Sequence, residues 1–117
     1  MNSMDAQTRT TMPPIVYGQF ALDPEGWNVT LNGNIVPLTA SEFILLRELV
    51  LQSGRVLTRE ALEQALQETP ACNRQGNREL SGRSIDLLVS RLRRKLLRAG
   101  CDWIRTMRFV GYQFVPE

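Results

Sequence analysis

One segment, residues 83–98, limits the fold of this chain more than any other, because its pattern fits an amphipathic helix of more than four turns. With about 100° between successive residues, the aliphatic side chains gather on one stripe, which holds Ile85, Leu88, Val89, Leu92 and Leu96. The opposite side holds Arg83, Leu87, Ser90, Arg94 and Arg98, with Ser84 and Arg91 on its flank. Such a helix docks on its own protein through the first stripe and presents the second outward.

The outward side combines arginines, hydroxyls and one aliphatic residue, a mixture that suits a DNA groove. Guanidinium groups pair with phosphate and guanine oxygens, and an aliphatic side chain contacts the methyl group of thymine. A basic helix face that is merely solvated is the alternative interpretation. The charge distribution favours a polyanion, since residues 1–77 carry a net charge of −3 and residues 78–117 a net charge of +5. An anionic membrane is a weaker candidate because the basic helix lacks an inserting aromatic face.

Several function classes conflict with the residue content. The chain has no histidine, and its two cysteines, Cys72 and Cys101, do not form a CxxC pattern. We therefore expect no enzyme activity, no metal site and no cofactor. We expect both cysteines to be free thiols, although a disulfide between them stays open. With no apolar run long enough to cross a bilayer and no signal peptide, the sequence predicts a cytoplasmic protein.

The length of 117 residues fits one domain, which at this size buries roughly two-thirds of its extended surface. Residues 1–14 are polar and end in two prolines, so we expect a disordered linker or tag there. The folded domain should then comprise residues 15–117. Its aromatic core candidates are Trp27, Phe43, Trp103 and Phe114.

The N-terminal part of the domain, residues 15–38, has strand signals. A turn is expected at residues 23–26, followed by alternation of Trp27, Val29 and Leu31 with polar residues. Asn32-Gly33 is a strong hairpin turn signal. The returning strand should cover residues 35–38, with Pro37 favouring a sheet edge.

Two helices are expected next. Thr39-Ala-Ser-Glu42 forms a capping box ahead of an apolar stripe of Phe43, Leu46, Leu49 and Val50, and Gly54 should stop this helix. Thr58 is a good cap for a second helix to about Gln67, with Leu62, Ala65 and Leu66 inward. Residues 68–80 read as a loop. Ser81 or Ser84 can cap the third, basic helix, which should end near Gly100.

The C-terminal residues 103–115 predict a hairpin that turns near residues 109–111. The order of strands, three helices and a hairpin is the plan of a winged helix-turn-helix, an α+β fold. We expect Asp86 to position an arginine through an ion pair, because DNA would repel its charge.

Four segments, in order, resemble the effector domains of OmpR/PhoB-type response regulators. Residues 38–46 resemble the first-helix signature and residues 54–62 the entry to the second helix. Residues 83–96 resemble the recognition helix and residues 104–112 the wing. The likeness extends over residues 16–116. It implies an N-terminal four-stranded antiparallel sheet, three helices and a C-terminal β-hairpin wing, with the third helix in the DNA major groove and the wing near the minor groove.

Carried over by position, the resemblance and the helical wheel give one set of expected DNA contacts: Arg83, Ser84, Leu87, Ser90, Arg91, Arg94, Thr106 and Arg108. Arg93 stays open, because the wheel leaves it at the shoulder of the helix whereas the resemblance implies that this position can also reach a phosphate. The chain departs from the pattern at Phe109, where many relatives have glycine in the wing turn. A phenylalanine there either stiffens the hairpin or packs against the sugar backbone.

The resemblance also implies partners. The full-length protein would carry a phosphorylated receiver domain as part of a two-component phosphorelay. Residues 68–80 would contact RNA polymerase, although their composition equally suits a connection without a partner. In the absence of DNA, the isolated domain should be a monomer. On double-stranded promoter DNA, two copies should bind direct repeats head to tail. Two alternatives are a winged-helix protein-interaction module and a transcription regulator that naturally lacks a receiver domain.

Overall fold

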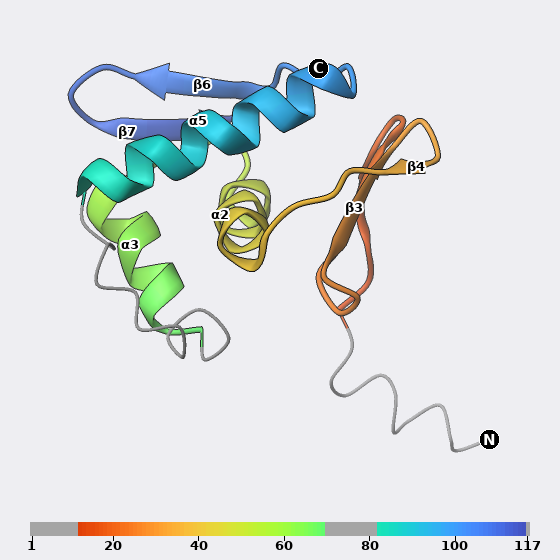
Figure 1. Ribbon diagram of the computed structural model, residues 1–117, viewed down its shortest axis with the longest axis horizontal. Helices are drawn as coiled ribbons and strands as arrows, with labels where there is room; N and C mark the ends of the chain where they lie inside the picture. The colour runs from red at the N-terminus through yellow and green to blue at the C-terminus, as the bar shows by residue number, and fades with distance from the viewer. Residues whose placement is uncertain (1–11, 70–81, 117) are drawn as a thin grey trace.

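The computed structural model describes residues 12–69 and 82–116, with side chains from residue 85 onward in the second range. Within these ranges it contains a four-stranded sheet, three helices and a C-terminal hairpin, which confirms the predicted α+β winged helix-turn-helix. Figure 1 shows the N-terminal sheet on one side of the helices and the hairpin beside the third helix. The predictions for residues 1–11 and 70–80 lie outside the described residues.

The N-terminal sheet is antiparallel, in the order β1 (Ile15–Tyr17), β2 (Phe20–Asp23), β3 (Asn28–Leu31) and β4 (Asn34–Ile35). Asn32 and Gly33 both have positive φ angles, as the predicted hairpin turn requires. Two details differ from expectation. A turn at Gly18, with φ of +61°, separates β1 from β2, and β4 ends before Pro37, whose ring has no N–H for a strand ladder.

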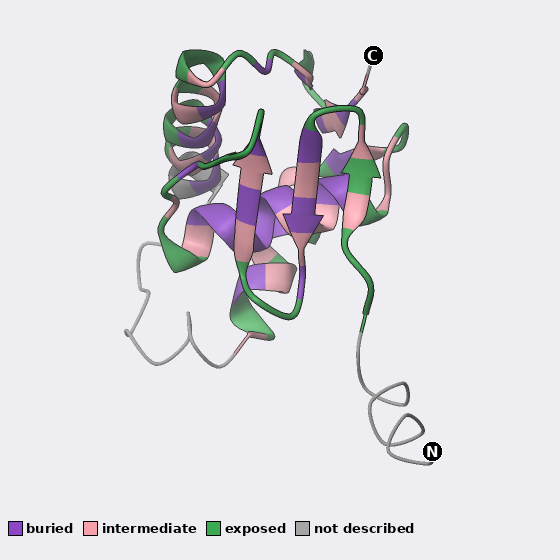
Figure 2. Ribbon diagram, turned by 90° about the vertical axis from the view of Figure 1, so that its right-hand side faces the viewer, coloured by how far each residue is buried: buried purple, intermediate pink, exposed green. Residues whose placement is uncertain are grey.

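Helix α2 (Ala40–Leu51) begins with the predicted capping box. The Glu42 amide donates to Thr39 Oγ1 at 3.2 Å, and the Thr39 amide donates to Glu42 Oε1 at 2.9 Å. The expected single apolar stripe was too narrow, since Ile44 and Leu45 are also fully buried. The reason is the position of α2, which packs on α3, α5 and β7. Figure 2 shows it behind the N-terminal sheet as well.

Helices α3 (Arg59–Gln67) and α5 (Gly82–Arg98) follow. The predicted N-cap of α3 is confirmed, since the Thr58 hydroxyl accepts the Ala61 amide at 3.0 Å. Helix α5 ends in a Schellman motif around Gly100, which has φ of +99°. There the Cys101 amide donates to the Leu96 carbonyl at 2.8 Å and the Gly100 amide to Leu97 at 3.0 Å. Helix α5 begins at Gly82, so Ser84 lies within it and the prediction of Ser84 as a cap was wrong. The alternative cap, Ser81, lies outside the described residues.

The wing consists of β6 (Ile104–Met107) and β7 (Gly111–Phe114), and β7 also pairs with a strand that was not predicted, β5 (Val56–Thr58). Gly111 lies against β5 so closely that a Cβ atom there would be 1.9 Å from the Leu57 carbonyl oxygen. A side chain at this position is incompatible with the β5–β7 pairing.

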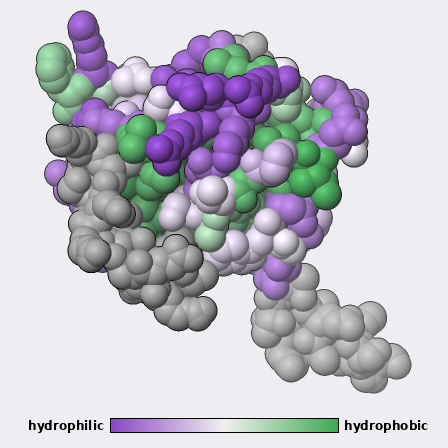
Figure 3. All heavy atoms as spheres, viewed as in Figure 1, coloured by the Kyte–Doolittle hydropathy of each residue, from purple (hydrophilic) through white to green (hydrophobic). Residues whose placement is uncertain are grey.

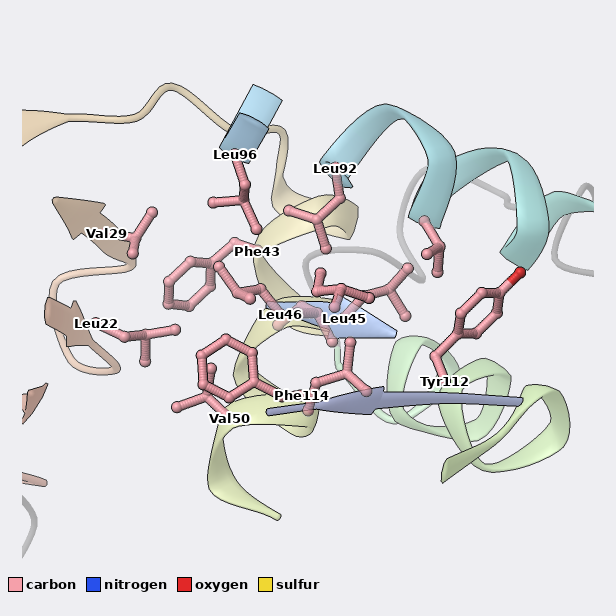
Figure 4. Packing of buried hydrophobic residues seen from close by; sticks show 14 of the residues in the cluster. Leu22, Val29, Phe43, Leu45, Leu46, Val50, Leu92, Leu96, Tyr112 and Phe114 are labelled. Atoms are coloured by element: carbon pink, nitrogen blue, oxygen red, sulfur yellow. The ribbon is translucent and has the colours of Figure 1, made fainter. Parts of the chain in front are cut away.

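The core joins both sheets to the helices, and Figure 4 shows Leu92 and Leu96 of α5 above Phe43, Leu45 and Leu46 of α2. Of the aromatic candidates, Phe43 and Phe114 are buried and Trp103 packs partly buried against the core.

Trp27 was expected inside with Val29 and Leu31, and this was wrong. It precedes β3 with φ of +55° and is 38% exposed, so its ring leaves the strand alternation. The ring stacks on Phe43, with 5.4 Å between centroids, and Arg47 covers it. None of the helices in the described ranges is long and apolar enough to span a membrane.

Candidate nucleic-acid interface

Helix α5 has the two faces that its sequence predicts. Ile85, Val89, Leu92 and Leu96 are almost completely buried. The predicted contact residues on the opposite face are exposed wherever the structure describes their side chains: Leu87, Ser90, Arg91 and Arg94. Leu87 is 51% exposed, so this aliphatic side chain takes no part in the core. Figure 3 shows strongly hydrophilic side chains gathered over α5.

Arg83 and Ser84 belong to the first turn of α5, and their side chains lie outside the described residues. Their predicted contacts with DNA therefore stay predictions. Lys95 of this helix points toward the protein, and its Nζ lies 2.7 Å from Glu42 Oε1 on α2. Glu42 is only 2% exposed, so Lys95 holds α5 to the protein and does not belong to the outward face.

Asp86 joins three elements at the N-terminal end of α5. Its Oδ1 lies 2.7 Å from Arg59 Nε on α3 and accepts a hydrogen bond from the Tyr112 hydroxyl on β7 at 2.6 Å. Figure 4 shows the Tyr112 oxygen directed toward this end of the helix. The predicted ion pair between Asp86 and an arginine is confirmed. Its partner comes from α3, which no local spacing in the sequence indicates.

The electrostatics of this cluster keep Asp86 ionised. Burial acts to raise the pKa of Asp86, but the hydrogen bonds from Tyr112 and Arg59 and the charge of Arg59 outweigh it and lower the pKa. The pKa of Arg59 is raised by the same bond and charge. Burial, followed by the bond to Asp86, raises the pKa of Tyr112. The negative charge of Asp86 is thus balanced by the positive charge of Arg59, so the pair adds little repulsion toward an anion.

Arg93, left open by the sequence, links α5 to the wing. Its Nη2 donates to Thr106 Oγ1 on β6 at 2.6 Å, and its Cζ lies 5.9 Å from the centroid of the Tyr112 ring. At this distance the ring attracts the guanidinium group. Thr106, a predicted DNA contact, is exposed but already accepts this hydrogen bond. The only sequence signal for the pair was the position of Arg93 at the shoulder of the helix.

The tip of the wing is the turn between β6 and β7, where Val110 N donates to Met107 O at 2.9 Å. Arg108 is exposed, as a phosphate contact requires, and its Cζ lies 5.8 Å from the centroid of the Phe109 ring. Phe109 has φ of +66°, a left-handed conformation that glycine adopts more readily than a residue with a side chain.

The candidate interface thus consists of the outward face of α5 and the adjoining wing, which Asp86 and Arg93 link to each other. Among the described residues no group of three or more acidic, histidine or cysteine side chains is arranged to hold a metal ion. Cys101 is a buried free thiol whose pKa is raised by burial, and Cys72 lies outside the described part.

Comparisons with known proteins give relatives across nearly the whole domain. The Pseudomonas aeruginosa response regulator protein PmrA is 39% identical over 105 residues, which are 90% of this chain and 43% of PmrA. The chain therefore spans less than half of this relative.

Two solved structures have the same fold. One is the Klebsiella pneumoniae RstA DNA-binding domain in complex with RstA box, which has a TM-score of 0.72 and 32% identity and covers 91% of this chain and 100% of its own. The other is the Escherichia coli CpxR DNA-binding domain, with a TM-score of 0.68, 32% identity and coverage of 90% and 98%. The family model "Transcriptional regulatory protein, C terminal" matches residues 33–114. The chain belongs to this family, the C-terminal effector domains of OmpR/PhoB-type response regulators.

Proposed function

We propose that this domain binds double-stranded promoter DNA and controls transcription, with α5 in the major groove and the wing beside the adjacent minor groove. The observation that carries the proposal is the exposed outward face of α5, where arginines, a serine and Leu87 stand opposite the buried stripe. Support comes from the RstA DNA-binding domain, which has a similar fold and is in complex with RstA box. The family to which this chain belongs consists of transcriptional regulators rather than enzymes.

Each predicted contact has a role in this proposal. Arg91 and Arg94 pair with phosphates or guanine edges, Ser90 donates to an acceptor, and Leu87 meets a thymine methyl group. Arg83 and Ser84 extend the contact at the start of the helix. From the wing, Arg108 and Thr106 reach the backbone beside the minor groove. The bond between Arg93 and Thr106 supports a positioning role for Arg93.

The wider context is part of the same proposal. The full-length protein carries a phosphoacceptor receiver domain and acts in the cytoplasm, where promoters lie. Residues 15–117 form the DNA-binding unit, with residues 1–14 as linker. Two copies bind direct repeats head to tail, and residues 68–80 contact RNA polymerase. This assignment rests on the response-regulator relatives, of which the chain covers less than half.

Affinity measured over a salt series tests the proposal. Duplexes are selected by the domain from promoter fragments, and mobility shifts are recorded for Arg94→Ala and Arg55→Ala. Arg55 is the matched control, an exposed arginine just ahead of β5, where Val56 pairs with Gln113 at the end of β7 away from the wing tip.

Arg94→Ala should lower the affinity and reduce the slope of log K against log salt by about 0.9, the value for one phosphate contact. Arg55→Ala should leave the slope near that of the wild type. Equal slopes for both variants and the wild type would remove Arg94 from the interface. If the domain selected no duplex over random DNA, a protein-interaction module would replace this proposal.

A further inference from the structure

The wing tip carries an apolar cluster that the fold does not use. Phe109 is 93% exposed, Val110 49% and Met107 37%. In Figure 3, hydrophobic and strongly hydrophilic side chains protrude together at the end of the molecule where Figure 1 places the β6–β7 turn. Single exposed apolar residues are common, but three within four residues at the tip of a hairpin form a small patch.

Phenylalanine is unfavourable for the stability of the free domain at position 109 in two respects. Its φ of +66° lies in the left-handed region, which disfavours a side chain, and its ring is almost completely in water. Glycine would relieve both, because it adopts positive φ freely and has no ring to solvate. A residue that is unfavourable for the free domain in both respects points to a contact made outside it.

The rest of the wing decides where that contact lies. Thr106 on β6 is bonded to Arg93, and Tyr112 on β7 is bonded to Asp86, so both strands are fixed to α5. If α5 occupies the major groove, as proposed above, the tip must face the neighbouring minor groove. The Arg108 guanidinium beside the Phe109 ring gives the patch a positive charge that complements phosphates and disfavours a purely apolar partner.

We propose that Phe109 is a minor-groove wedge, whose ring enters the groove and partly unstacks one base step while Arg108 pairs with a phosphate. Apolar side chains that insert in this way bend DNA toward the major groove. The step should be pyrimidine–purine, because such steps unstack most easily. The wing thus selects deformable DNA without a hydrogen bond to a base. This inference rests on the proposed DNA binding.

The test compares the wild-type domain with Phe109→Ala and Phe109→Gly on duplexes that the wild type has selected. Alanine removes the ring and keeps the strained φ, whereas glycine removes both. Affinity is measured by mobility shift. Unstacking is measured by the fluorescence of 2-aminopurine at the step facing the wing, and bending by energy transfer between the duplex ends.

Both variants should bind about tenfold more weakly than the wild type and should lose the 2-aminopurine signal and the bend. Phe109→Gly should melt at the same temperature as the wild type or higher. Replacing the flexible step by an A-tract should weaken the wild type and leave both variants unchanged.

Two results would overturn the wedge. Unchanged affinity and fluorescence in both variants would mean that the ring meets another macromolecule, such as a protein. Loss of affinity in Phe109→Gly alone would trace the effect to a loosened turn. Failure of DNA binding itself gives a different result, because the wild type would then select no duplex.

Discussion

Replacing Lys95 by methionine tests whether its ion pair with the buried Glu42 holds α5 against α2. The ammonium group of Lys95 lies 2.7 Å from Glu42 Oε1, the oxygen that also accepts the Thr39 amide in the capping box. Methionine keeps most of the aliphatic length of lysine and removes the charge. The buried carboxylate then keeps its bond to the backbone and loses its counterion.

The two side chains differ in exposure, and this sets the expected magnitude. Breaking a fully buried ion pair by removing one partner costs about 3–5 kcal/mol. The Glu42 side chain is 2% exposed but that of Lys95 is 34% exposed, so water can approach from the lysine side. We therefore expect Lys95→Met to lower the free energy of unfolding by about 2 kcal/mol.

The pair between Arg59 and Asp86 is the internal comparison, because it has the same length of 2.7 Å but exposures of 32% and 46%. Screening by water should limit the contribution of this pair to the free energy of unfolding to about 1 kcal/mol or less. Arg59→Met should therefore destabilise the domain less than Lys95→Met.

Urea unfolding followed by tryptophan fluorescence measures these differences. Adding Glu42→Gln to Lys95→Met should recover about 1 kcal/mol, because glutamine keeps the capping box and carries no charge to be buried. The reasoning fails if Lys95→Met costs no more than Arg59→Met, or if the double variant is no more stable than Lys95→Met alone.

Three further outcomes follow from the structure. The pKa of Asp86 lies below its ordinary value of 3.8, so its stabilisation is complete above that pH and is lost as the pH falls through the lowered pKa. In acid unfolding below about pH 4, Asp86→Asn should therefore lose stability less steeply than the wild type. Gly111→Ala should destabilise the domain by about 3 kcal/mol in urea, since its Cβ would meet the Leu57 backbone; a loss under about 1 kcal/mol would contradict this. Cys101, buried and with a raised pKa, should react with iodoacetamide in the native domain far more slowly than in urea, as mass spectrometry would show; equal rates would refute its burial.

Local patterns in the sequence were sufficient for the parts of the fold that depend on neighbouring residues. The capping box of Thr39 and Glu42, the Asn32-Gly33 turn and the two faces of α5 are each encoded within a few positions, and the structure confirms them. Arginines on an outward face could be selected in the same way, because helical periodicity alone separates Arg94 from the buried stripe.

Features that depend on distant segments were not predictable. Strand β5 pairs with β7, which is more than 50 residues away in the sequence. Ile44 lies outside the expected apolar stripe of α2 and is buried because other elements surround the helix. The two partners of Asp86 are 26 and 27 residues away in the sequence, and the hydrogen-bond partner of Arg93 is 13 residues away. No local spacing therefore connects these pairs. Trp27 matched a strand pattern that its positive φ interrupts.

The link from Arg93 to Thr106 and Tyr112 has a consequence for recombining domains within the family. A hairpin grafted from another member must bring a hydroxyl at position 106 and an aromatic ring at position 112, or Arg93 of the recipient helix loses its contacts to the hairpin. A chimera that ignores this pair would retain every proposed DNA-contacting residue of the recipient helix, yet its new hairpin would meet the duplex at the wrong angle.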